Sequence, residues 1–188
     1  KKSNIIIKNV GLNPARCGLI DILKSMGGSI EIKNHKVTSN EEVGDIYVSS
    51  SSLKGIHISE DVIPNIIDEI PILTIAAAFA EGETLISNAE ELRVKESDRL
   101  QAISDGLIKI NIKHELYQDG IKVFGSSEDI SVSPEINSHG DHRIAMSFLI
   151  ASLRSENGIF VKDCKNIFTS FPEFIEVMKS LGIDIHER

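Results

Sequence analysis

One local pattern occurs three times along the chain and limits what it can fold into. Segments 22–30 and 177–185 each combine the last turn of an amphipathic helix, a glycine that can end it, and a run typical of a strand. Segment 100–112 has the same order with Asn111 in the place of the glycine, and Asn is the next best residue for a left-handed cap. Repeated helix-to-strand units predict an α/β fold.

These copies predict one domain of three repeats, at about residues 1–62, 63–128 and 129–188. Segments 70–80 and 141–153 are apolar almost all round, which is typical of helices inside a core. The first repeat begins with a strand at 5–10, so its leading strand and helix would lie upstream of Lys1 or be absent. The other predicted helices are 13–26, 97–110 and 170–181, and the other predicted strands are 29–33, 45–49, 55–58, 84–88, 112–116, 120–124, 158–161 and 183–187.

Several helix starts are marked by residues that favour them. Asn13 followed by Pro14 predicts an N-cap and a proline in the first turn, and Pro71 marks a second start. The run from Ser170 to Glu173 has the spacing of a capping box.

The charge and hydropathy of the chain exclude several classes of protein. Lys and Arg total 20 against 28 Asp and Glu, a formal net charge of −8, so the overall field repels nucleic acid. No apolar run approaches the roughly 20 residues of a membrane-spanning helix, which argues against a membrane protein. Cys17 and Cys164 lack metal-site spacing and fit free thiols in a reducing compartment. We therefore expect a cytoplasmic protein.

Cations gather at two predicted helix starts, where they are locally unfavourable. Arg93, Lys95 and Arg99 lie just before and within the first turn of one helix, and His142 and Arg143 open another. A helix start carries unpaired N–H groups and a partial positive charge, so basic side chains there make sense if an anion binds. Two such clusters in one repeated unit could converge on a small, multiply charged anion. The alternative is a solvated turn with weak local ion pairs.

Other kinds of site have less support. Asp141, His142 and His139 lie close in sequence, but no third ligand has supporting spacing, so we expect no metal site. The sequence contains no glycine-rich phosphate loop and no serine elbow motif.

The run Arg93-Val94-Lys95-Glu96-Ser97-Asp98-Arg99-Leu100 resembles the signature of the 5-enolpyruvylshikimate-3-phosphate (EPSP) synthase family. Three further segments agree with the family in order, at 67–71, 141–146 and 169–174. The resemblance implies two domains of three βαβαββ units each, with inner helices surrounded by outer sheets, an inside-out α/β barrel. This chain resembles the C-terminal domain, and the N-terminal domain is absent from it. Because the chain begins with Lys1, we expect a piece of a longer protein.

The family resemblance also implies a reaction and the residues that take part in it. The family transfers the enolpyruvyl group of phosphoenolpyruvate to the 5-hydroxyl of shikimate 3-phosphate, releases phosphate, and needs no metal or organic cofactor. Asp68 resembles the carboxylate that hydrogen-bonds the reacting hydroxyl, Glu96 the proton shuttle, and Lys95 a residue near the hydroxyl and phosphate. Arg99 and Arg143 resemble the pair that binds phosphoenolpyruvate, with His142 beside them.

One departure and two alternatives accompany this interpretation. Thr169 stands where many family members have a lysine that contacts phosphate. Enzymes of this family are targets of glyphosate, and the sequence leaves sensitivity open. A transferase that acts on UDP-N-acetylglucosamine shares the fold, and a non-catalytic anion-binding or assembly module is possible as well. We expect this chain to be inactive alone and the full enzyme to be a monomer.

Overall fold

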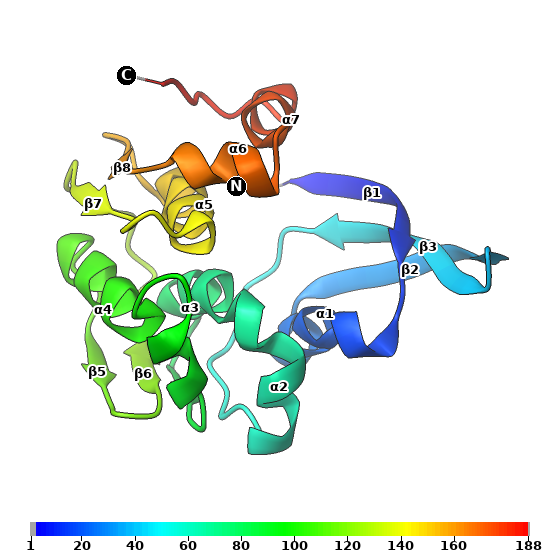
Figure 1. Ribbon diagram of the computed structural model, residues 1–188, viewed down its shortest axis with the longest axis horizontal. Helices are drawn as coiled ribbons and strands as arrows, with labels where there is room; N and C mark the ends of the chain where they lie inside the picture. The colour runs from blue at the N-terminus through cyan, green and yellow to red at the C-terminus, as the bar shows by residue number, and fades with distance from the viewer. Residues whose placement is uncertain (1–2, 188) are drawn as a thin grey trace.

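The computed structural model describes residues 3–187, in which helices alternate with short sheets (Figure 1). The strands are β1 (Asn4–Gly11), β2 (Ser29–Thr38), β3 (Glu41–Ser49), β4 (Glu83–Ile86), β5 (His114–Leu116), β6 (Ile121–Phe124), β7 (Glu135–Asn137) and β8 (Phe160–Lys162). The α-helices are α1 (Gly18–Ser25), α2 (Ile63–Ile66), α3 (Ile70–Ala78), α4 (Arg99–Lys109), α5 (His142–Ala151), α6 (Lys165–Ser170) and α7 (Phe174–Ser180). Short 3₁₀ helices occupy Pro14–Arg16, Glu60–Val62, Ile67–Glu69, Glu90–Val94 and Ser152–Arg154.

The strands form three separate sheets. Antiparallel sheets have the orders β1-β3-β2 and β4-β6-β5, whereas β7 and β8 pair in parallel. Segment 54–57 adds two isolated parallel bridges alongside β4, Lys54 with Glu81 and His57 with Leu85. The expected α/β class is confirmed, although among the described strands no sheet closes into a barrel.

Helices α3 and α5 pack against each other at the centre, with the sheets outside them (Figure 1). Both are apolar on nearly every side, and Ile70, Leu73, Ile144 and Phe148 are almost completely buried. The prediction that segments 70–80 and 141–153 are core helices is therefore confirmed. Helix α3 ends two residues earlier than predicted, and the last residues of the second segment form a 3₁₀ turn after α5. Since α3 and α5 are fixed by burial along their length, their first turns have a defined place.

Helix α4 packs beside α5 through a close approach at Gly106. A Cβ at this position would lie 2.0 Å from the ring of Phe148, so only glycine lets the two helices come this near. The packing brings the first turns of α4 and α5 together.

Predicted helix caps are confirmed at four places and wrong at one. Asn13 is the N-cap of the 3₁₀ turn Pro14–Arg16, and its Oδ1 accepts a hydrogen bond from the backbone N–H of Ala15 at 3.0 Å. Gly27, Asn111 and Gly182 have φ values of 95°, 59° and 84°, the left-handed conformation expected after a helix. The capping box at Ser170 is wrong, because Ser170 ends α6 and Glu173 precedes α7 with no side-chain cap bond. Phe171 lies before Pro172, and the residue before a proline is disfavoured in helical conformation.

Other sequence predictions differ in extent from the structure. The helix expected at 13–26 is a 3₁₀ turn followed by α1, and β2 extends to Thr38 in a hairpin with β3. Segment 183–187 forms no strand, because it pairs with no other strand in the described chain. The short elements α2, α6 and β7 were not expected.

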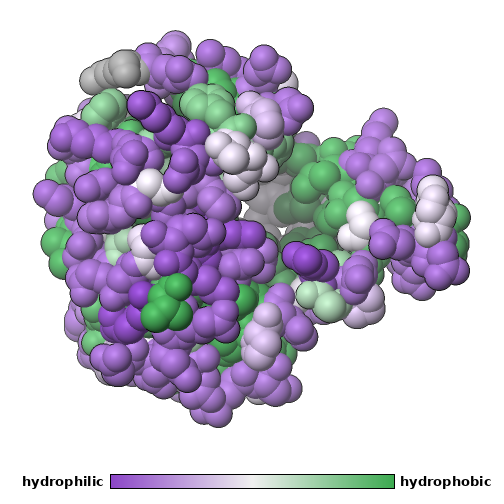
Figure 2. Space-filling model, in the orientation of Figure 1, coloured by the Kyte–Doolittle hydropathy of each residue, from purple (hydrophilic) through white to green (hydrophobic). Residues whose placement is uncertain are grey.

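Figure 2 shows a hollow between the helices and the sheet of β1, β3 and β2, with apolar residues on the side of the sheet. Ile6 and Ile7 of β1 are about half exposed. No helix within residues 3–187 is long and apolar enough to cross a membrane.

Candidate functional site

Asp141 is the buried centre of the site. It precedes α5, and its Oδ1 accepts hydrogen bonds from the backbone N–H groups of Arg143 at 2.9 Å and Ile144 at 3.4 Å, which makes it the N-cap. Its Oδ2 accepts from Arg99 Nε at 2.8 Å and from Ser97 Oγ at 3.2 Å. One carboxylate, fully buried, therefore joins the start of α5 to the start of α4.

Arg99 is the first residue of α4, and its side chain is only 1% exposed. Besides Asp141, its guanidinium donates from Nη1 to Asp68 Oδ1 at 2.9 Å and from Nη2 to Glu96. Asp141 is buried, whereas the side chains of Asp68 and Glu96 are 39% and 51% exposed. Arg99 is thus held on its inner edge by a fixed partner and on its outer edge by two side chains that reach solvent.

Arg143 meets Arg99 at Asp68. Its Nη1 donates to the backbone carbonyl of Asp68 at 2.8 Å and to Glu69 Oε1 at 3.3 Å, and its Nη2 lies 3.5 Å from Asp68 Oδ2. Asp68 and Glu69 belong to the 3₁₀ turn that leads into α3. The first turns of α3, α4 and α5 therefore bring both arginines and Asp68 to one place.

The charges around this place set the pKa of two groups. Burial by itself lowers the pKa of Arg99, but the hydrogen bond and charge of Asp141, together with Asp68 and Glu96, outweigh it and raise the pKa above its usual value. Burial raises the pKa of Asp68, but Arg99 and Arg143 lower it further, so the pKa of Asp68 lies below its usual value. Asp68 is therefore an ionised hydrogen-bond acceptor at neutral pH.

The remaining cations of the sequence motif pair with groups other than Asp68, although the charge of Lys95 is near enough to lower the pKa of Asp68. Lys95 Nζ pairs with Glu91 Oε1 at 2.5 Å. Arg93 turns away from Arg99 and donates to the backbone carbonyls of Tyr117 and Gln118 and to Asp98. Within residues 3–187, the side chain of His142 makes no hydrogen bond or ion pair, although it lies next to Arg143 in the first turn of α5.

The expectation that an anion binds beside these cations stays a prediction, and the structure places carboxylates of the chain itself next to them. Two guanidinium groups, Arg99 and Arg143, contact four carboxylates, those of Asp68, Glu69, Glu96 and Asp141. The anions beside the helix starts are thus side chains of the chain itself. Sequence reasoning placed Asp141 near the site but gave it no role. The neighbouring residues indicate its position at a helix start, but they do not indicate its bonds to Ser97 and Arg99.

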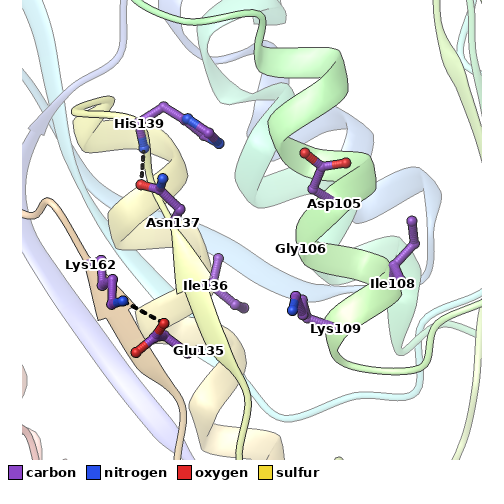
Figure 3. A pocket seen from close by; sticks show the side chains of 9 residues that line it. All are labelled: Asp105, Gly106, Ile108, Lys109, Glu135, Ile136, Asn137, His139 and Lys162. Carbon is purple, nitrogen blue, oxygen red and sulfur yellow. Dashed lines mark hydrogen bonds and ion pairs between the residues drawn. The ribbon is translucent and has the colours of Figure 1, made fainter.

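The candidate side chains are absent from the lining of the cavity of about 450 Å³ between α4 and β7 (Figure 3). Two pairs of its polar groups bond each other, with Lys162 paired to Glu135 at 2.5 Å and the His139 backbone N–H donating to Asn137. Of the six candidates, Glu96 alone lines a nearby cavity of about 290 Å³ beside Ser97 and Gln101. Thr169 is exposed on α6. No group of three or more His, Cys, Asp or Glu placed to hold a metal ion occurs in the described residues.

Comparison with known proteins gives consistent results. The family model "EPSP synthase (3-phosphoshikimate 1-carboxyvinyltransferase)" matches residues 1–178. The 3-phosphoshikimate 1-carboxyvinyltransferases of Nitrosococcus oceani and Hydrogenovibrio crunogenus are 48% and 45% identical over 185 residues, which cover 98% of this chain and 41% of each relative. The chain therefore spans about two fifths of the length of these relatives.

Solved structures agree with the sequence comparison. An EPSP synthase from Acinetobacter baumannii is similar with a TM-score of 0.91 and 43% identity, over 96% of this chain and 42% of that one. The enolpyruvyl transferase NikO from Streptomyces tendae has a TM-score of 0.77 at 18% identity, over 98% of this chain and 40% of that one, a likeness of fold alone.

Proposed function

Because the chain belongs to the EPSP synthase family, we propose that it is the C-terminal domain of a 3-phosphoshikimate 1-carboxyvinyltransferase, a cytoplasmic enzyme of aromatic amino acid biosynthesis. The domain comprises three repeats, at about 1–62, 63–128 and 129–188, and a further N-terminal domain completes the enzyme. The substrates are phosphoenolpyruvate and shikimate 3-phosphate, and the enzyme uses no cofactor. The proposal depends on one observation above all, the meeting of Arg99 and Arg143 at Asp68.

The reaction needs a base, an acid and cations. The 5-hydroxyl oxygen of shikimate 3-phosphate bonds to C2 of phosphoenolpyruvate, its proton passes to a base, and C3 gains a proton. Loss of a proton from C3 and of phosphate from C2 then restores the double bond. Proton transfer by placed side chains and cations aimed at the developing charge are the effects that accelerate such a step.

The geometry suits these roles. Asp68 is held ionised by two arginines, so it can accept a hydrogen bond from the hydroxyl. Arg143 is 30% exposed and can turn donors toward a carboxylate or phosphate, a group that arginine grips through parallel hydrogen bonds. Glu96 and His142 lie beside the arginines and can exchange protons, and Lys95 adds a positive charge near Asp68.

The balance of charge supports a division of labour between the two parts of the enzyme. The carboxylates in contact with Arg99 and Arg143 outnumber them two to one. A substrate with several negative charges is then repelled unless cations from another part of the protein join the site. We therefore expect this chain to show no turnover alone.

The test is steady-state turnover by the full-length protein that contains this chain. We expect phosphate release with phosphoenolpyruvate and shikimate 3-phosphate, and none with UDP-N-acetylglucosamine as acceptor. Arg143→Ala removes hydrogen bonds to a charged group, worth about 1.5 to 3 kcal/mol, so kcat/KM should fall about 10-fold to 150-fold. Arg99→Ala is a poorer probe, because it leaves the buried carboxylate of Asp141 without its charged partner.

A matched control is Arg154→Ala. The side chain of Arg154 is 32% exposed, close to the 30% of Arg143, and it pairs with Asp129. Arg154 lies in the 3₁₀ turn after α5, at the opposite end of this helix from Arg143. It should leave kcat/KM unchanged. Binding of phosphoenolpyruvate without turnover would instead indicate an anion-binding module, and turnover with the UDP-sugar would indicate the related transferase.

A further inference from the structure

The segment Lys95–Asp98 joins the 3₁₀ helix Glu90–Val94 to α4 and carries two of the candidate side chains, Lys95 and Glu96. Its backbone N–H groups bond to no backbone carbonyl in the part of the chain that the structure describes. Regular secondary structure therefore does not hold this segment in place. Its position depends on side-chain contacts, those of Arg93 and Asp98 at its two ends and that of Ser97 with Asp141 in between.

Arg93 holds the beginning of the segment. Its Nε donates to the backbone carbonyl of Gln118 at 2.6 Å and its Nη2 to that of Tyr117 at 2.7 Å. These carbonyls lie in the turn between β5 and β6, about 25 residues further along the chain. A planar guanidinium can reach two adjacent acceptors at once with little loss of side-chain freedom for each bond, which an ammonium group cannot do.

The same guanidinium also holds the end of the segment. Arg93 Nη1 donates to Asp98 Oδ2 at 2.9 Å, while Asp98 Oδ1 accepts from the backbone N–H of Gln101 at 3.0 Å and caps α4. Arg93 and Asp98 thus close the loop that contains Lys95 and Glu96, and they connect it to the helix that begins with Arg99.

The turn that Arg93 grips is itself rigid. Its Gly120 packs directly on β4, since a Cβ there would lie 2.0 Å from the carbonyl oxygen of Ile86. Tyr117 N–H bonds to the Gly120 carbonyl at 2.9 Å, and Ala89 N–H bonds to the Asp119 carbonyl at 2.7 Å. A sheet with one buried face therefore provides the fixed point to which Arg93 attaches the loop.

We propose that Arg93 is a positioning residue, which sets the register of Lys95 and Glu96 relative to Arg99 by attaching their loop to the β5–β6 turn and to the cap of α4. This role rests on the proposed function. The role also explains the contacts of Arg93. In the sequence this residue is grouped with the anion-binding cations, but its guanidinium donates to two backbone carbonyls and to Asp98. Arg99 is held by the buried Asp141 and Arg143 by the backbone carbonyl of Asp68, whereas Glu96 is 51% exposed and bonds to the outer edge of Arg99. Loss of Arg93 should therefore displace Glu96 more than the anion-binding pair.

The test compares Arg93→Met, Arg93→Lys and Arg154→Met in the full-length protein. Arg93→Met should lower kcat about 100-fold, the size of effect that a displacement near 1 Å produces, with a much smaller change in KM for phosphoenolpyruvate. Arg93→Lys keeps a positive charge beside Asp98 but cannot bond to both backbone carbonyls of the turn at once. Its kcat should therefore lie between those of the wild type and the methionine variant. A role in folding alone would not produce this split between kcat and KM.

Arg154 is the matched control, because it makes the same kinds of contact away from the site. Its Nε donates to Asp129 at 2.5 Å and its Nη2 to the backbone carbonyl of Ser127 at 3.0 Å. Arg154→Met should lower the melting temperature and leave kcat unchanged. A kcat for Arg93→Met within threefold of wild type, or an equal loss in Arg154→Met, overturns the role.

Two further outcomes decide the remaining cases. If Arg93→Met does not fold, Arg93→Lys decides, and an unchanged kcat in that variant overturns the role. Absence of turnover in the wild-type full-length protein overturns the proposed function and the role together, whereas turnover that does not depend on Arg93 overturns the role alone.

Discussion

The substitution Asp141→Asn tests whether one buried carboxylate joins the starts of α4 and α5. Asparagine has nearly the same shape and can still accept the cap hydrogen bonds of Arg143 and Ile144 through one oxygen. The atom that faces Arg99 Nε and Ser97 Oγ then becomes an amide N–H₂ group, which donates and does not accept. Arg99 loses a charged acceptor and gains a donor in its place.

The burial of this pair sets the size of the effect. Asp141 and Arg99 have side chains that are 0% and 1% exposed, so water cannot replace the lost partner. Breaking a buried ion pair by removing one partner costs about 3 to 5 kcal/mol. For a chain of 150 to 250 residues, each kcal/mol shifts the melting temperature by about 2 to 4 °C. We expect Asp141→Asn to lower the melting temperature by about 6 to 20 °C.

The assay is thermal unfolding followed by circular dichroism, with Asp98→Asn as the control. Asp98 is the N-cap of the neighbouring helix α4 and also pairs with an arginine, but its side chain is 41% exposed. Asparagine caps a helix as well as aspartate does, and an exposed ion pair contributes less than about 1 kcal/mol. The control should therefore melt within about 4 °C of wild type.

Equal shifts in the two variants would refute the reasoning, because they would mean that burial of the Asp141–Arg99 pair adds nothing to its contribution. A shift below about 3 °C in Asp141→Asn would refute it as well. In either case Asp141 would be an ordinary helix cap, and the position of Arg99 would depend on Asp68 and Glu96 instead.

Two further predictions concern packing and pH. Gly106→Ala places a methyl group against Phe148 and should lower the free energy of unfolding by about 1 to 3 kcal/mol in urea titrations. The control Gly11→Ala meets no atom within 4 Å and should change this free energy by less than about 0.5 kcal/mol. Similar values for both variants would contradict the close approach of α4 and α5. The pKa of Asp68 is lower in the folded chain than its ordinary value near 4, so its charge stabilises the fold above that pH and this stabilisation is lost as the pH falls. Between about pH 5 and pH 3 the free energy of unfolding should therefore fall more steeply for wild type than for Asp68→Asn, and parallel curves would exclude the ion pairs of Asp68 with Arg99 and Arg143.

Features decided by neighbouring residues could be predicted from the sequence. The left-handed caps at Gly27, Asn111 and Gly182 depend on local backbone preference, and the central place of α3 and α5 depends on side chains that are apolar on nearly every side. The convergence of Arg99 and Arg143 could also be predicted, since both open helices of a repeated unit.

Features that depend on distant partners could not be predicted. Segment 183–187 has the pattern of a strand, but a strand forms only where a second strand supplies hydrogen bonds, and the described chain places none beside it. Arg93 was grouped with Arg99 because both are basic, yet its acceptors lie in a turn some 25 residues away. The four carboxylates of the site come from three different helix starts, and no sequence pattern connects them.

On the proposed function, the arrangement of partners around Arg99 would let a buried arginine take part in binding. Its inner contact, Asp141, is inaccessible and also caps α5, so exchange there would disturb two helices. Its outer contacts, Asp68 and Glu96, are partly exposed and can rotate into solvent at small cost. An incoming carboxylate or phosphate would therefore replace an outer partner while the inner bond keeps the guanidinium plane in place. Where the anion replaces Glu96, its binding and the release of the proposed proton shuttle would become one event.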